Sequence, residues 1–112
     1  MGRTKEIVID ELKFTLGNLT QGDVVKIDNE SRKFNPRGGT YVDERLYELE
    51  YVTAAIKNWT FCDDKKEVYK VDKEHVGLLP PYVFLELLDE ATKLNMTQKQ
   101  LDFLAKLEKE QK

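Results

Sequence analysis

Three acidic residues that lie close together, Asp63, Asp64 and Glu67, are the first candidates for chemistry, because carboxylate oxygens bind divalent cations. A calcium loop places its oxygen ligands at alternate positions and needs a glycine at its sharpest turn, and residues 60–72 contain no glycine. Two lysines lie between the acidic residues and would repel a cation. We therefore predict a solvated turn here and no metal site.

The single histidine, His75, and the single cysteine, Cys62, are the other side chains that could act as a base, a nucleophile or a ligand. A zinc site needs several cysteine or histidine ligands, and this pair cannot supply them. A general base needs a positioned nucleophile, and neither a GxSxG motif nor a Cys-His order is present. We expect a protein that is not an enzyme and that has no cofactor.

A basic cluster, Arg32, Lys33 and Arg37, stands beside a Gly-Gly pair. A phosphate cradle would need glycines at a set spacing between a strand and a helix N-terminus, and neither the Walker nor the dinucleotide pattern occurs. The Asn-Pro and Gly-Gly pairs predict a loop over residues 33–39. Binding of an anion or a partner by this loop stays open as the alternative.

The chain has 112 residues, a length that suits one domain spanning residues 1–112. With 40% hydrophobic and 35% charged residues, the composition is that of a folded chain rather than a disordered one. The net charge of −3 disfavours a nucleic-acid binder, which needs a basic surface to release counterions from phosphates. A small regulatory protein that binds nucleic acid through the basic cluster is nevertheless one alternative.

The compartment is indicated by the cysteine count and by hydropathy. One cysteine excludes an internal disulfide and fits a reducing environment. The first residues do not resemble a signal peptide, and the apolar runs are far shorter than the roughly 20 residues of a membrane helix. We expect a cytoplasmic protein without a membrane partner.

The first half of the chain is predicted to open with a β-hairpin over residues 5–17, where apolar residues alternate on either side of a turn at residues 10–11. Because a two-stranded hairpin is marginal alone, its apolar face must pack on helices. A helix is then preferred for residues 21–32, with Thr20 as N-cap and Asp23 in the first turn. A strand is the alternative, since this segment is rich in β-branched residues.

A second helix is predicted from Thr40 onward, with Asp43 at the third helical position. Apolar residues three or four apart form one stripe along it. The stripe consists of Val42, Leu46, Leu49, Val52, Ile56 and Trp59. Tyr47 and Tyr51 flank this stripe; half-buried tyrosines beside a core are the favoured interpretation, and a partner interface is the alternative.

Residues 60–72 break the helical period and predict a short extended excursion. Asp72 then caps a short helical turn. A helix is predicted to begin at Pro81 or one residue to either side, because proline suits the first helical position, and to end at Asn95. The expected core face of this helix consists of Phe84, Leu87, Leu88, Ala91 and Leu94.

A last helix is predicted from Thr97, the N-cap of a capping box closed by Gln100. It carries apolar residues on two sides, whereas its polar end, about residues 106–112, is expected to fray. A helix with two apolar faces commonly packs on its own domain with one and on a partner with the other. The candidate partner interface therefore consists of Tyr47, Tyr51, Leu101, Phe103, Leu104 and Leu107.

These elements predict an α+β fold. An N-terminal β-hairpin is followed by a mainly helical bundle of three to four helices, with the extended excursion near residues 60–72.

Residues 56–95 also carry a resemblance to a known family. They contain an Ile/Trp helix end, a Trp-Thr-Phe step, an acidic turn, a capping Asp, a Leu-Leu-Pro step and an amphipathic helix that ends in Leu-Asn. This succession resembles the small tail assembly chaperones of long-tailed bacteriophages and prophages. Its expected core consists of Ile56, Trp59, Phe61, Leu79, Pro80, Leu87 and Leu88.

The resemblance implies a function in the host bacterial cytoplasm. Such chaperones bind the long, helical, aggregation-prone tape measure protein and keep it soluble until tube subunits polymerise around it. Self-association into a homo-oligomer is compatible with this role, since a long client offers repeated sites. A phage structural or adaptor protein that stays in the virion is the other alternative.

Overall fold

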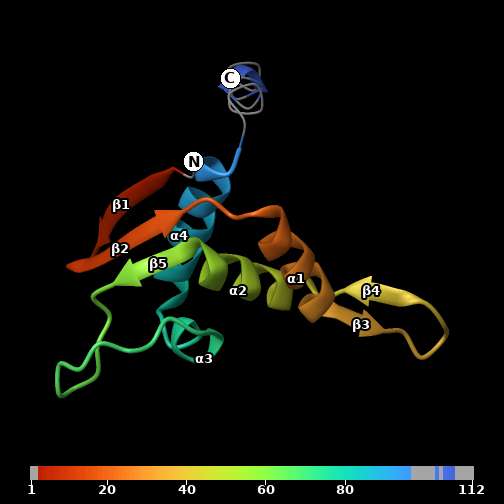
Figure 1. The fold of residues 1–112 in the computed structure, drawn as a ribbon, viewed down its shortest axis with the longest axis horizontal. Coiled ribbons are helices and arrows are strands. Elements are labelled where there is room, and N and C mark those ends of the chain that lie inside the picture. The colour runs from red at the N-terminus through yellow and green to blue at the C-terminus, as the bar shows by residue number, and fades with distance from the viewer. Residues whose placement is uncertain (1–2, 97–102, 104, 108–112) are drawn as a thin grey trace.

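The computed structural model describes residues 3–96, 103 and 105–107. In this part of the chain a three-stranded antiparallel sheet packs on helices, and a two-stranded hairpin projects from the opposite end of the helical layer (Figure 1). This mixture of an antiparallel sheet and helices confirms the predicted α+β class.

The N-terminal hairpin pairs β1 (Thr4–Ile9) with β2 (Leu12–Gly17). The turn consists of Asp10 and Glu11, as predicted, and both have positive φ angles, 48° and 70°. Residues with side chains visit this left-handed region at a steric cost, and a tight hairpin turn requires it. The alternating pattern of the two strands holds one apolar face toward the helices.

A third strand, β5 (Ile56–Trp59), completes this sheet by pairing antiparallel with β2. The prediction of one continuous helix through Trp59 is therefore wrong. Helix α2 (Glu44–Ala55) ends before β5, and Asp43 is its N-cap rather than its third residue, with its carboxylate accepting from the Leu46 amide at 3.1 Å.

A β-bulge explains why the sequence of β5 looked helical. Ile56 pairs with Leu16 and Trp59 with Phe14, so four residues of β5 span three of β2. The extra residue lets Ile56 and Trp59, three apart, both face the core, and this spacing imitates a helix period. The bulge lies close to Gly17, where a Cβ atom would come within 2.7 Å of the Lys57 side chain.

Helix α1 (Gln21–Ser31) confirms the preferred prediction for this segment. Thr20 and Asp23 form a complete capping box: the Asp23 amide donates to the Thr20 hydroxyl at 3.1 Å, and the Thr20 amide donates to the Asp23 carboxylate at 2.9 Å. Helix α1 packs on α2 and buries Ile27.

The predicted loop at residues 33–39 is a hairpin instead. Strands β3 (Arg32–Phe34) and β4 (Thr40–Val42) pair with each other, so Thr40 lies in a strand and does not open a helix. The Asn-Pro and Gly-Gly pairs form only the tip of the hairpin. Gly38 and Gly39 take φ angles of 106° and 78°, which glycine adopts without strain.

After β5 the chain makes the predicted excursion, a turn closed by a single bridge between Cys62 and Val68. Asp72 caps the short helix α3 (Lys73–Val76), and α4 (Pro81–Leu94) begins and ends where expected, with Asn95 as its C-cap.

The core lies between the sheet and α2, α3 and α4. Of the expected family core, four residues are buried, Phe61 and Leu88 are partly buried, and Pro80 is exposed at the N-cap of α4, so its place in the core was predicted wrongly. The buried residues of the core are Ile9, Phe14, Leu16, Val52, Ala55, Ile56, Trp59, Val76, Leu79, Val83, Leu87 and Ala91.

Candidate partner-binding groove

Helices α2 and α4 pack against each other and leave an open hollow of about 340 Å³ between their outer faces. Both helices turn their other faces to the core, so the side chains of this hollow come from the edges of the two apolar stripes. The hollow is lined by Tyr47, Glu48, Tyr51, Leu88 and Thr92.

The two tyrosines of the predicted interface lie on the wall of this hollow. Tyr47 and Tyr51 are both half-buried, and their rings stack at a centroid distance of 6.3 Å with 23° between the planes. Burial, and then the proximity of Tyr47, raise the pKa of Tyr51 above its ordinary value of 10.0. The Tyr51 hydroxyl is thus neutral at neutral pH, and its ring offers a largely apolar contact surface.

The end of α4 is fixed beside this wall. The Asn95 side chain accepts from the Leu19 amide at 2.8 Å and donates to the Ala91 carbonyl at 2.8 Å. Asn18 adds a hydrogen bond to the Leu94 carbonyl at 3.0 Å. These contacts tie α4 to the end of β2, so the walls of the hollow are pre-organised.

A second hollow of about 500 Å³ lies beside α2 and the start of α4 and shares one lining residue with the first. Glu48 lines both hollows, and Phe84 and Leu85 supply much of the second one. Leu85 is 60% exposed, although it is a large apolar residue on a helix. We call the two hollows together the α2–α4 groove, lined by Arg45, Tyr47, Glu48, Leu49, Tyr51, Val76, Gly77, Leu79, Pro81, Phe84, Leu85, Leu88 and Thr92.

The other half of the predicted interface is placed only in part. Phe103 and Leu107 are helical and 62% and 38% exposed. Leu101 and Leu104 lie outside the described residues, as do the predicted capping box at Thr97 and the end of the chain from residue 108.

The three basic residues of the predicted loop lie on the β3–β4 hairpin. Arg32 contacts the Asp28 carboxylate at 3.0 Å and the Thr40 hydroxyl at 3.1 Å. Lys33 and Arg37 are exposed, and the structure shows no ion pair for either within the part of the chain it describes.

Two of the residues considered for catalysis or metal binding, Asp63 and His75, contact neighbouring parts of the chain. The Asp63 carboxylate accepts from the Lys65 and Glu67 amides at 2.8 and 3.0 Å, so it shapes the turn. His75 stacks on Tyr69 with centroids 4.5 Å apart. Within residues 3–96, 103 and 105–107, no group of three His, Cys, Asp or Glu side chains is arranged to hold a metal ion.

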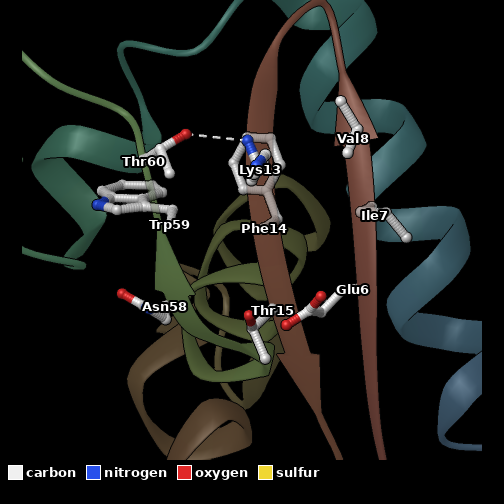
Figure 2. A pocket seen from close by; sticks show the side chains of 9 residues that line it. All are labelled: Glu6, Ile7, Val8, Lys13, Phe14, Thr15, Asn58, Trp59 and Thr60. Atoms are coloured by element: carbon white, nitrogen blue, oxygen red, sulfur yellow. Dashed lines mark hydrogen bonds between the residues drawn. The ribbon is translucent and has the colours of Figure 1, made fainter.

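The outer face of the sheet has a further hollow, of about 410 Å³ (Figure 2). Polar and apolar side chains both line it, because outward-facing positions alternate with core positions along each strand. The Lys13 amide donates to the Thr60 hydroxyl at 2.9 Å across it. The residues that line it are Glu6, Ile7, Val8, Lys13, Phe14, Thr15, Asn58, Trp59 and Thr60.

Sequence reasoning found the tyrosine wall of the α2–α4 groove and missed the α4 wall. Leu88 was expected on the core face of this helix, and Leu85 and Thr92 were not among the residues predicted for an interface. The sequence signal that could have identified the α4 wall is Leu85, a large apolar residue outside the expected core face of its helix.

No helix in the described part of the chain is long and apolar enough to cross a membrane. No protein-family model, no curated protein and no solved structure matches the chain.

Proposed function

We propose that this chain is a phage tail assembly chaperone that holds an apolar helical segment of a tape measure protein in the α2–α4 groove. It would act in the bacterial cytoplasm, before the tail tube is complete. The observation that carries the proposal is the groove itself, a pre-organised apolar channel between two helices with exposed Leu85 at one end and the Tyr47–Tyr51 pair at the other.

The chemistry of the groove suits a helical client. An amphipathic helix binds by placing its apolar face into a hydrophobic groove, with anchors three or four residues apart. Tyrosines are efficient in such sites, because they offer a large contact area and lose little side-chain freedom. The groove lining is predominantly apolar, and its charged side chains, Glu48 and Arg45, suit the polar rim of such an interface.

The surface charge also supports a chaperone. The net charge of −3 keeps a small protein soluble, and it would help to keep a bound apolar client soluble too. This role requires binding and release and no catalysis. It agrees with the resemblance of residues 56–95 to the tail assembly chaperones.

Co-expression with a candidate tape measure protein tests the proposal. The intact chain should raise the soluble fraction of the client and co-purify with it. Leu85→Asp should lower the amount of complex about tenfold or more, since a buried leucine is worth about 1.5–3 kcal/mol and 1.4 kcal/mol is a factor of ten. Val25→Asp on α1, where the valine is 49% exposed, is the matched control and should leave the complex intact.

Two results would contradict the proposal. One is an unchanged soluble fraction of the client with no co-purified complex. The other is an equal loss of complex in Leu85→Asp and in Val25→Asp while both variants keep the melting temperature of the parent. Detection of the chain in purified phage particles would favour the alternative of a virion structural or adaptor protein.

A further inference from the structure

The β3–β4 hairpin forms an arm that stands clear of the body of the molecule (Figure 1). We call residues 32–42 the basic arm. Each of residues 32–41 is exposed, and Phe34 is 87% exposed, more than any other large apolar side chain in the described residues. An exposed phenylalanine on a projecting hairpin offers a partner a large apolar anchor.

The arm has a defined shape rather than that of a loose loop. The Asn35 amide donates to the Gly39 carbonyl at 3.0 Å, and the Gly38 amide donates to the Asn35 carbonyl at 2.9 Å, which closes the tip. At the base, the Asp43 amide donates to the carbonyl of buried Ser31 at 2.8 Å. Binding through such an arm loses little conformational entropy.

The charge of the chain is divided unequally between the arm and the body. The arm contains Arg32, Lys33 and Arg37 and no acidic residue, so it carries +3. Because the whole chain has a net charge of −3, the rest of the chain carries −6. The body of one copy is therefore electrostatically complementary to the arm of another copy.

The α2–α4 groove offers the apolar counterpart on that body. Glu44 and Glu48 are four residues apart on α2 and therefore lie on the same side of the helix. Glu48 lines both hollows of the groove, and Arg45 lines the second one. The arm of the same chain is exposed and leads away from its own helices, so it does not fill its own groove.

We propose that the basic arm of one copy docks in the α2–α4 groove of a second copy, with Phe34 in the apolar channel and Lys33 and Arg37 beside Glu48. Two different surfaces meet in such a contact, so it is head-to-tail, and repetition gives a ring or an open chain of molecules. This inference does not depend on what else the groove binds. If the proposed client uses the same groove, client and arm compete for it.

Sedimentation velocity of the full chain over a concentration series tests the contact. The parent chain should gain mass with concentration, and Phe34→Ser should weaken association about tenfold or more, the effect of removing a central anchor. Added salt should weaken association too. Val68→Ser, which changes a 60% exposed valine on the 62–68 turn, is the control and should behave like the parent.

A mixing experiment separates a head-to-tail contact from a symmetric one. Phe34→Ser has a defective arm and an intact groove, whereas Leu85→Asp has an intact arm and a defective groove. At a concentration where the parent associates and the weakened contacts do not form, each variant alone should stay monomeric. An equimolar mixture should then form a complex that stops at two molecules, because the intact arm of Leu85→Asp docks in the intact groove of Phe34→Ser.

Three results would overturn the inference. The first is a parent chain that stays monomeric at every concentration. The second is self-association that is unchanged in Phe34→Ser. The third is a protein that shifts a DNA duplex in a gel through the basic arm while it stays monomeric. Client binding that survives in Phe34→Ser would leave the proposed function intact, so the two proposals fail separately.

Discussion

Phe14 of β2 and Trp59 of β5 face each other across the sheet, with ring centroids 6.4 Å apart and planes inclined at 73°. Both side chains are buried. The Trp59 Nε1 atom also donates to the Tyr69 carbonyl at 2.7 Å, so this ring ties the sheet to the segment that leads into α3. Edge-to-face aromatic pairs of this kind stabilise a core beyond their buried area.

Trp59→Phe should lower the free energy of unfolding by about 1–3 kcal/mol, because the ring contact is partly kept while the part-buried Tyr69 carbonyl loses its donor. Urea unfolding followed by circular dichroism measures this loss. Phe61→Leu, which alters the neighbouring ring without removing a hydrogen bond, is the comparison. Equal stability of Trp59→Phe and the parent would contradict the assigned role of the indole.

The stability of α3 should depend on acid pH through Asp72. Its carboxylate accepts from the His75 amide at 2.9 Å, and this hydrogen bond lowers the pKa of Asp72 below its ordinary value of 3.8. A carboxylate whose pKa is lower in the folded state stabilises that state above the unfolded pKa, and the contribution is lost as the pH falls through the folded pKa. The loss is therefore expected below about pH 3.8.

Asp72→Asn isolates this contribution, since asparagine caps a helix equally well but does not titrate. The melting-temperature difference between parent and variant should shrink as the pH falls from neutral to below the folded pKa. Asp64→Asn removes the same charge from an exposed turn position and is the control for the change in net charge. A difference that is constant with pH would contradict the capping role.

The stability of the protein should depend on the ion pair between the buried Glu50 carboxylate and Lys73. Glu50 is 8% exposed, and its carboxylate lies 2.6 Å from the Lys73 ammonium of α3. Lys73→Met leaves this carboxylate without its ion-pair partner and should cost about 1 kcal/mol, a modest value because the half-exposed lysine is screened by water.

Glu30→Gln is the control for this pair, since Glu30 contacts the same ammonium at 3.5 Å from an exposed position. It should change the free energy of unfolding by less than Lys73→Met does. The double variant Glu50→Gln with Lys73→Met should recover part of the loss in chemical denaturation. If Lys73→Met and Glu30→Gln lower the free energy of unfolding by the same amount, the burial of Glu50 does not strengthen its ion pair with Lys73.

The sequence predicted those elements whose ends carry local chemistry. Thr20, Asp72, Pro81 and Asn95 bound three helices as expected, because capping hydrogen bonds and the fixed φ of proline act within one turn of the chain. The Asp10–Glu11 turn was likewise visible.

The elements that were missed depend on partners far away in the sequence. The bulge that makes β5 a strand exists only opposite β2, so the spacing of Ile56 and Trp59 was read as helical. The strands of the basic arm are three residues each, too short for a periodicity signal. The groove combines Tyr51 with Leu85 and Leu88, and only the packing of α2 on α4 brings these side chains together.

Hydrogen exchange on the purified complex with a tape measure segment tests the central claim most directly. If the client binds in the α2–α4 groove, amides around residues 47–51 of α2 and 85–92 of α4 should become more protected from exchange. The outer face of the sheet, around residues 6–8 and 13–15, should exchange as in the free protein. Protection confined to the sheet face, or none at the groove in a complex that is stable on purification, would contradict the account.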